Sequence, residues 1–228
     1  MIRLIDVSKS YKLGRGRKDV LRSVTLTLAR RNIALIGQNG AGKSTLLRLI
    51  AGGELPDSGR ILREGSVSWP LGFSGGFNRS TTGADNTRFV SRIYGQDTDR
   101  VLDFVRDFSE LGAFFEMPVA TYSSGMRARL AFGISMAVSF DWYLVDEITE
   151  VGDDRFKEKC RLAFKERRVD ARIIMVSHSL ATLRSYCDMA VVVHGGDVEL
   201  YDDLEEGIAV HRQLMKLTPP AQPIGGAA

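Results

Sequence analysis

A glycine-rich segment of this chain has the residue types and spacing that bind a nucleoside triphosphate. It consists of Gly37, Gln38, Asn39, Gly40, Ala41, Gly42, Lys43 and Ser44, is followed by Thr45, and fits the pattern G-x-x-x-x-G-K-[ST]. Its glycines let backbone N–H groups face a phosphate, Lys43 adds a positive charge, and Ser44 offers a hydroxyl for Mg²⁺. A glycine-rich turn with a chance lysine is the alternative. The apolar run before the segment and the helical pattern after it favour a P-loop, residues 37–44.

Two acids follow a second apolar run. Residues 142–145 are apolar, and Asp146 and Glu147 come next. In open α/β sheets, ligands bind at the carboxyl ends of the strands. Asp146 is therefore expected to hold Mg²⁺, directly or through water, and Glu147 is the candidate general base for an attacking water. A helix-capping acid pair is the alternative, and the P-loop favours catalysis.

Two aromatic side chains complete the candidate site. His178 follows the apolar run 173–176, which predicts that it lies at the same sheet edge, contacting the γ-phosphate and positioning water. A lone histidine is more often structural, but this location favours function. Tyr11 lies near the end of the first predicted strand, where its ring could stack on adenine. An ordinary tyrosine in a strand is an equally good interpretation.

A Ser-Ser-Gly segment precedes a further predicted helix. Ser123, Ser124 and Gly125 stand before an apolar helical pattern that runs to about residue 138. Such residues first indicate a helix N-cap. The same geometry makes an anion-binding site, because the first N–H groups of a helix have no partner within it. From the residues alone, the cap is the favoured interpretation.

The pattern of short apolar runs predicts an α/β fold with a P-loop nucleoside-triphosphatase core. Runs at 33–36, 142–145 and 173–176 indicate buried parallel strands. Residues 2–7 and 20–28 indicate an N-terminal antiparallel β subdomain, joined by a basic loop at 14–18. Further predicted elements are a strand at 60–69, a helical insert at about 85–138, helices at 44–51, 155–168 and 203–217, and a terminal hairpin at 191–193 and 198–201. We expect one domain over 1–217 and a disordered tail over 218–228.

Composition excludes several other classes of protein. The net charge is only +3, and the cluster of Lys12, Arg15, Arg17 and Lys18 is interleaved with glycines, so no nucleic-acid partner is expected. A solvated hairpin loop is the favoured interpretation of that cluster, with contact to anionic lipid or nucleotide phosphate as the lesser one. The two cysteines form no C-x-x-C pattern. No apolar run approaches the roughly 18 residues of a membrane span, and the N-terminus is unlike a signal peptide, so a cytoplasmic location is expected.

The order of these motifs resembles the nucleotide-binding subunits of ABC transporters, over about residues 1–210. The resemblance implies ATP and Mg²⁺ as cofactors and ATP hydrolysis as the activity. It also implies a head-to-tail dimer with a second copy, in which the Ser-Gly signature of one subunit closes over the γ-phosphate held by the other. By position, Tyr11 matches the adenine-stacking aromatic residue, His178 the switch histidine and Asp153 the aspartate of the dimer-contact loop.

Departures from the common pattern make the resemblance more specific. The signature reads Tyr-Ser-Ser-Gly-Met at 122–126, where most members have Leu-Ser-Gly-Gly-Gln, and no glutamine lies between Trp69 and Asn78. The dimer-contact loop, Glu-Val-Gly-Asp at 150–153, lacks the usual Ser/Thr-x-Leu-Asp. Segments 68–73, 75–77, 121–126 and 147–153 resemble ATP-binding subunits that export capsular polysaccharide in Gram-negative bacteria.

The capsule-type resemblance has close alternatives. Exporters of O-antigen or teichoic acid are similar, but some O-antigen versions carry a further C-terminal carbohydrate-binding domain, for which this chain ends too early. The capsule type implies a polysaccharide substrate, a membrane-spanning permease subunit that meets the surface around 70–115, and a peripheral position on the cytoplasmic side of the inner membrane. Two competing functions are a soluble ABC ATPase and a module that binds ATP without hydrolysing it. Lys43, Asp146, Glu147 and His178 together argue against the second.

Overall fold

A six-stranded, mostly parallel sheet forms the centre of the computed structural model, which describes residues 1–14, 16–28, 31–71, 76–146, 153–167 and 170–217. Its strand order is β5-β6-β7-β3-β8-β9, and only β9 runs antiparallel to its neighbour. The strands are β3 (Ile33–Gly37), β5 (Val67–Pro70), β6 (Trp142–Asp146), β7 (Arg172–Val176), β8 (Met189–His194) and β9 (Asp197–Tyr201). The predicted α/β class, with its mostly parallel sheet, is confirmed.

A second sheet of three antiparallel strands has the order β2-β1-β4. It is formed by β1 (Ile2–Leu13), β2 (Gly16–Leu28) and β4 (Ser58–Arg63). The predicted antiparallel pair is confirmed, but the predicted bounds of the basic loop, 14–18, are wrong. Tyr11 pairs with Lys18 and Lys12 with Arg17, so most of that segment lies in strands. Residues 16–19 at the start of β2 are all exposed, and basic residues are therefore tolerated within the hairpin.

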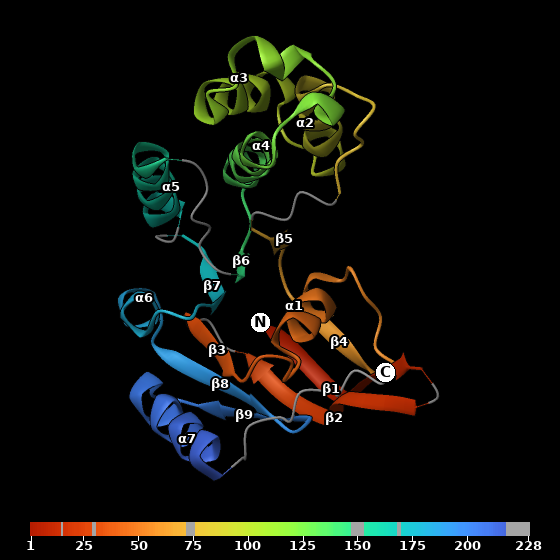
Figure 1. The fold of residues 1–228 in the computed structure, drawn as a ribbon, viewed down its shortest axis with the longest axis vertical. Helices are drawn as coiled ribbons and strands as arrows, with labels where there is room; N and C mark the ends of the chain where they lie inside the picture. The colour runs from red at the N-terminus through yellow and green to blue at the C-terminus, as the bar shows by residue number, and fades with distance from the viewer. Residues whose placement is uncertain (15, 29–30, 72–75, 147–152, 168–169, 218–228) are drawn as a thin grey trace, which may run out of the picture.

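Helices cover both faces of the central sheet, because the side chains of a strand alternate between its faces. In β3, Ile33 and Leu35 pack with α1 (Lys43–Ala51) and the antiparallel sheet. Ala34 and Ile36 belong to the other core cluster. That second cluster includes buried residues of α5 (Asp154–Arg167), α6 (Leu180–Tyr186) and α7 (Leu204–Leu217). Figure 1 shows α1 next to the antiparallel sheet and α7 beside β8 and β9.

The predicted helical insert is also present. It contains α2 (Gly83–Ile93), α3 (Thr98–Ser109) and α4 (Ser124–Ala137), with 3₁₀ turns at Gly112–Glu116 and Val119–Thr121. It has a core of its own, in which Val105, Phe115 and Leu130 are fully buried. These helices lie together at the top of Figure 1, at the far end of the molecule from the antiparallel sheet. The insert is thus a packed unit that carries its own apolar centre.

The structure differs from the prediction in two further details. The strand expected at 60–69 is two strands, β4 and β5, which belong to different sheets. Gly65 turns the chain between them at φ +87°, where a Cβ would lie 2.7 Å from Asp141 Oδ2. The helix α6 was not predicted, although Ser179 caps it by accepting a hydrogen bond from the Thr182 N–H. In the part of the chain that the structure describes, no helix combines the length and apolar character needed to span a membrane.

Candidate functional site

A cavity of about 600 Å³ gathers side chains from four separate sequence motifs. The predicted site residues that line it are Tyr11, Asn39, Gly40, Gly42, Lys43, Ser44, Thr45, Asp146 and His178. Gly37, Gln38 and Ala41 complete the same loop without lining the cavity. The cavity has the size of small-molecule sites in general.

The sheet topology explains why these residues meet. Strands β6, β7 and β3 are parallel neighbours, so their carboxyl ends share one edge. Asp146 is the last residue of β6 and pairs with Val176, the last residue of β7. The P-loop leaves the end of β3, and His178 follows β7. The expected placement of three motifs at one sheet edge is therefore observed.

The glycines of the P-loop are required by close backbone approach. A Cβ on Gly37 would lie 2.5 Å from the Val193 carbonyl oxygen. Gly42 has φ +114°, and a Cβ there would lie 2.6 Å from Val20 Cγ1. Gly42 also precedes α1 and offers no side-chain cap. The first N–H groups of α1 are consequently suited to an anion at this end of the helix.

Lys43 is positioned inside the loop that it belongs to. Its ammonium group donates to the Gly37 carbonyl at 2.7 Å and to the Gln38 carbonyl at 2.9 Å. A positive charge is thereby held next to the backbone amides of the loop. Such a combination of amide dipoles and a lysine favours the phosphates of a nucleotide.

Two oxygen donors in the cavity fit a magnesium ion. Ser44 offers a hydroxyl and Asp146 a carboxylate, and both line the cavity. Mg²⁺ prefers oxygen ligands, retains several waters and takes only one or two protein carboxylates beside substrate phosphates. Within the described ranges, no group of three or more His, Cys, Asp or Glu side chains is arranged to hold a metal. The donor set thus suits a metal that arrives with a nucleotide.

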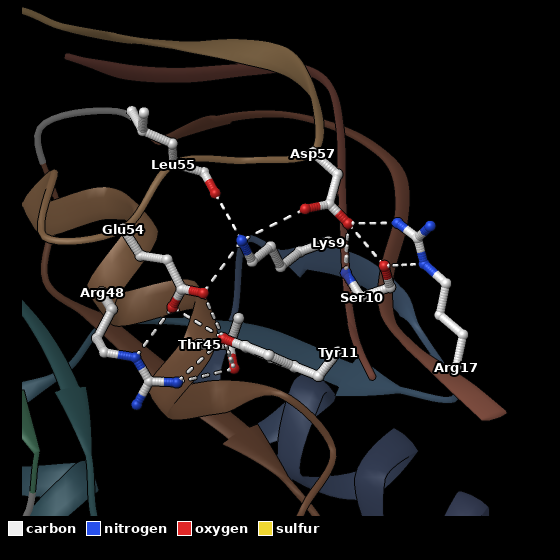
Figure 2. Close-up of polar contacts among 9 residues, drawn as sticks. All are labelled: Lys9, Ser10, Tyr11, Arg17, Thr45, Arg48, Glu54, Leu55 and Asp57. Carbon is white, nitrogen blue, oxygen red and sulfur yellow. Dashed lines mark hydrogen bonds and ion pairs between the residues drawn. The ribbon is translucent and has the colours of Figure 1, made fainter. Parts of the chain in front are cut away.

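Tyr11 is fixed at the cavity by a network that the sequence analysis did not anticipate (Figure 2). Its hydroxyl donates to the two carboxylate oxygens of Glu54 at 2.7 and 2.8 Å. Arg48 donates to the same carboxylate at 3.1 Å and to the Tyr11 hydroxyl oxygen at 3.2 Å. Burial alone would raise the pKa of Glu54, but hydrogen bonds from Tyr11, Lys9 and Arg48 outweigh it and hold that pKa below its usual value. Glu54 belongs to no recognisable motif, so its contact with Tyr11 could not be predicted from the residues around it.

Lys18 is a further cavity residue. It lies in β2 and not in a solvated loop, and its ammonium donates to the Gly40 carbonyl of the P-loop at 3.3 Å. The lesser interpretation of the basic cluster, contact with nucleotide phosphate, gains support for this one residue from its position. The signal for it was the basic character of the segment itself.

The Ser-Ser-Gly segment forms the expected N-cap but does not line the cavity. Ser123 accepts a hydrogen bond from the Met126 N–H at 3.2 Å, and α4 begins at Ser124. Gly125 follows within the first turn. The segment belongs to the helical insert, so one chain alone does not bring it among the residues that line the P-loop cavity.

Asp153 also lies outside the cavity, at the start of α5. It accepts a hydrogen bond from the Phe156 N–H at 2.9 Å and pairs with Arg129 at 3.2 Å. The Phe156 N–H, followed by the charge of Arg129, lowers the pKa of the Asp153 carboxyl. Glu147, the predicted base, and residues 150–152 of the dimer-contact loop fall outside the described residues, as do residues 72–75.

Known proteins resemble this chain over most of its length. A family model described as "ABC transporter" matches residues 21–150. The chain is 49% identical over 217 residues to "Polysialic acid transport ATP-binding protein KpsT" of Escherichia coli, with 93% of this chain and 99% of that protein covered. It is 47% identical over 215 residues to "Capsule polysaccharide export ATP-binding protein CtrD" of Neisseria meningitidis serogroup B, with 94% of this chain and 100% of that protein covered.

The fold is also that of solved ATP-binding cassettes. A dimeric cassette in a post-hydrolysis state, bound to ADP and Pi, superposes with a TM-score of 0.73 over 90% of this chain and 99% of its own. Its sequence identity is 19%, so this likeness concerns the fold. Together with the family match and the long alignments at nearly half identity, it leads to one conclusion: the chain belongs to the ABC transporter family, among its ATP-binding subunits.

Proposed function

We propose that this chain is the ATP-hydrolysing subunit of an ABC exporter that moves a polysaccharide, of the capsular type, from the cytoplasmic side of the inner membrane. The observation that carries the ATPase part is the single cavity that unites Tyr11, the P-loop, Asp146 and His178. The cargo rests on the relatives, whose names specify polysialic acid transport and capsule polysaccharide export.

Different residues of the cavity would bind the adenine base and the phosphates of ATP. The ring of Tyr11, which lines the cavity, is proposed to stack on adenine, and the loop amides with Lys43 would bind the phosphates. Ser44 and Asp146 would hold Mg²⁺, which neutralises charge on the phosphate oxygens.

Hydrolysis needs a water, a base and a positioned γ-phosphate. In the proposed reaction, Glu147 accepts a proton from the attacking water, whose oxygen bonds to the γ-phosphorus. The bond from that phosphorus to the bridging oxygen breaks, and the products are ADP and phosphate. His178 lines the same cavity as the P-loop and is proposed to contact the γ-phosphate and orient the water.

A head-to-tail dimer is the proposed active assembly. The Ser123–Gly125 segment carries a capped helix N-terminus, which suits a phosphate, yet it is absent from the residues lining its own P-loop cavity. In a dimer, the Ser123–Gly125 segment of one copy could lie against the P-loop cavity of the other. The partner's signature would then close over the γ-phosphate, with Asp153 near the dimer contact.

A membrane-spanning permease is the second proposed partner. The helical insert exposes large apolar side chains at Phe89 (64% exposed) and Ile93 (60% exposed), which are four residues apart on α2. Residues at this spacing share one face of a helix, and exposed apolar faces mark interaction sites. This face falls within the surface at 70–115 where permease contact is expected. ATP-driven closing and reopening of the dimer would be transmitted through it.

The test of this function is a Glu147→Gln substitution in the native host. If the proposal holds, surface polysaccharide is lost and polymer accumulates inside the cell, because ATP binds but is not hydrolysed. Surface and intracellular polysaccharide are quantified side by side. Glu205→Gln, an exposed change on α7, is the matched control and should leave export intact. Unchanged surface polymer in the Glu147→Gln strain, with no second exporter in its genome, would contradict the polysaccharide assignment.

A further inference from the structure

Beside the cavity, a network of charged and polar side chains links Tyr11, which is proposed to stack on adenine, to the helix that follows the P-loop. Tyr11 belongs to β1, whereas Arg48 and Thr45 belong to α1, the helix that leaves the P-loop. Arg48 donates to Thr45 Oγ1 at 3.3 Å, and the Tyr11 hydroxyl lies 3.4 Å from the same oxygen. Figure 2 shows Tyr11 and Arg48 reaching the carboxylate of Glu54, which follows α1, with Thr45 beside them.

Glu54 is the centre of this network. Its carboxylate accepts hydrogen bonds from Tyr11 and Arg48, and it pairs with Lys9 at 3.1 Å. Its side chain is only 20% exposed, so these interactions are partly shielded from solvent. A carboxylate in such a position is stabilised by several donors at once. Removing it would leave a phenol and two cations without their shared acceptor.

The same network holds the ring of Tyr11 from two directions. Its hydroxyl is held by Glu54, and Lys9 Nζ lies 5.6 Å from the ring centroid. Lys9 is held in turn by the Leu55 carbonyl at 2.8 Å and by Asp57 at 3.4 Å. The ring that lines the cavity therefore has little freedom to turn away from it.

We infer that Glu54 is a positioning residue for nucleotide binding: it holds the Tyr11 ring at a fixed place relative to the P-loop and so sets the affinity for the adenine base. The inference rests on the proposed role of Tyr11 as the base-stacking residue. A pre-positioned ring loses less conformational entropy on binding than a mobile one, so the gain appears as affinity. Glu54 does not touch the nucleotide and acts through Tyr11.

The experiment compares two probes, ATP and inorganic tripolyphosphate, by calorimetric titration of the purified chain. Tripolyphosphate lacks a base, so it reports on the P-loop alone. Glu54→Ala is expected to weaken ATP binding about 3- to 10-fold while tripolyphosphate binding is unchanged, because the ring remains but is no longer held, so that a stacking contact is weakened and not lost. Tyr11→Phe, which keeps the ring and removes the hydroxyl, should behave like Glu54→Ala. Glu64→Ala, at an exposed carboxylate after β4, is the matched control.

A double variant separates positioning from a general structural role. Because Glu54 acts through the ring, Tyr11→Ala with Glu54→Ala should bind ATP no more weakly than Tyr11→Ala alone. The inference is overturned if Glu54→Ala weakens both probes equally, if its effect persists when Tyr11 is alanine, or if it binds ATP normally while Tyr11→Ala does not. Normal ATP binding by Tyr11→Ala would instead show that the Tyr11 ring does not contact adenine, and this result would also overturn the inference.

Discussion

At the scale of single residues, the site combines groups that belong to recognisable motifs with one network of side chains, around Glu54, that belongs to none. The P-loop glycines, Lys43 and Ser44 are positioned by backbone geometry that any side chain at Gly37 or Gly42 would disrupt. Glu54, by contrast, acts through side-chain hydrogen bonds that a single substitution removes. The two kinds of residue therefore differ in what a mutation tests: folding of the loop in one case, placement of a ring in the other.

Lys43 carries the clearest prediction at this scale. Lys43→Ala removes a charge held between the Gly37 and Gln38 carbonyls and should weaken ATP binding about 10- to 100-fold, as expected for one lost hydrogen bond to a charged group. Calorimetric titration with ATP and Mg²⁺ measures it. Lys157→Ala, on the exposed face of α5, serves as the control. An affinity within twofold of the parent chain would show that the ammonium is not a phosphate ligand.

Lys18 should have a smaller and salt-dependent effect. Its ammonium lies at the cavity edge, where solvent and ions screen its field. Lys18→Ala is therefore expected to weaken ATP binding about 2- to 5-fold at low salt, with a smaller loss at high salt. Titrations of both proteins at two salt concentrations measure the difference. A loss that is independent of salt would point to packing and not to charge.

At the scale of elements, the parallel strands were predictable because buried parallel strands are short and continuously apolar. Strands β3, β6 and β7 are such runs, and the groups that follow them, including Asp146 and His178, could be placed from the sequence. The turn at Gly65 could not, since its reason is an approach to Asp141, far along the chain. The hydrogen bond from Tyr11 to Glu54 likewise spans 43 residues without a motif.

The contact between α7 and β8 provides a prediction at this scale. A Cβ on Gly207 would lie 2.3 Å from the Ala190 Cβ, so the helix can approach the strand only because position 207 is glycine. Gly207→Ala should lower the free energy of unfolding by about 1–3 kcal/mol through overpacking. In an unconstrained helix the same change would be stabilising by roughly 1 kcal/mol. Chemical denaturation shows whether the free energy of unfolding falls or rises in Gly207→Ala. Glu206→Ala, exposed on the same helix, is the control.

At the scale of the whole molecule, acid should weaken the link between β1 and the loop after α1. The Ser10 hydroxyl donates to Asp57, and this bond, with Arg17 and the Ser10 N–H, outweighs burial and lowers the Asp57 pKa to about 2. A carboxyl with a lowered folded pKa stabilises the fold above its unfolded pKa and loses that contribution as pH falls towards the folded value.

Asp57→Asn should therefore lower the thermal midpoint at neutral pH, since the charged partner of Arg17 is lost. The difference in thermal midpoint between the two proteins should stay constant down to about pH 4.5 and narrow below pH 4, because the parent carboxyl then protonates in the unfolded chain while it stays ionised in the folded one. Thermal unfolding across that range measures it. A gap that widens on acidification would show that the Asp57 pKa is raised and not lowered.

The largest-scale consequence concerns the assembly. The capped N-terminus of α4 lies in the helical insert (Figure 1). The residues that line the P-loop cavity lie instead at the edge of the central sheet. If a partner's signature binds the γ-phosphate, ATP should join two copies whenever hydrolysis is blocked. Glu147→Gln with ATP and Mg²⁺ is then expected to have twice the 25.2 kDa mass of the chain by light scattering, and to return to the monomer mass with ADP.

A second substitution tests whether the signature makes that contact. Gly125 has open space around it, with its nearest neighbour, Ser123 Oγ, 3.9 Å from a built Cβ. Gly125→Asp should therefore fold, since an acid in the first turn of a helix is favourable. In the Glu147→Gln background, however, its charge would oppose the γ-phosphate and prevent the dimer, whereas Gly125→Ala would permit it. A dimer that forms equally with aspartate and alanine would place the contact elsewhere, because no phosphate-facing site could accept the added negative charge without loss of affinity.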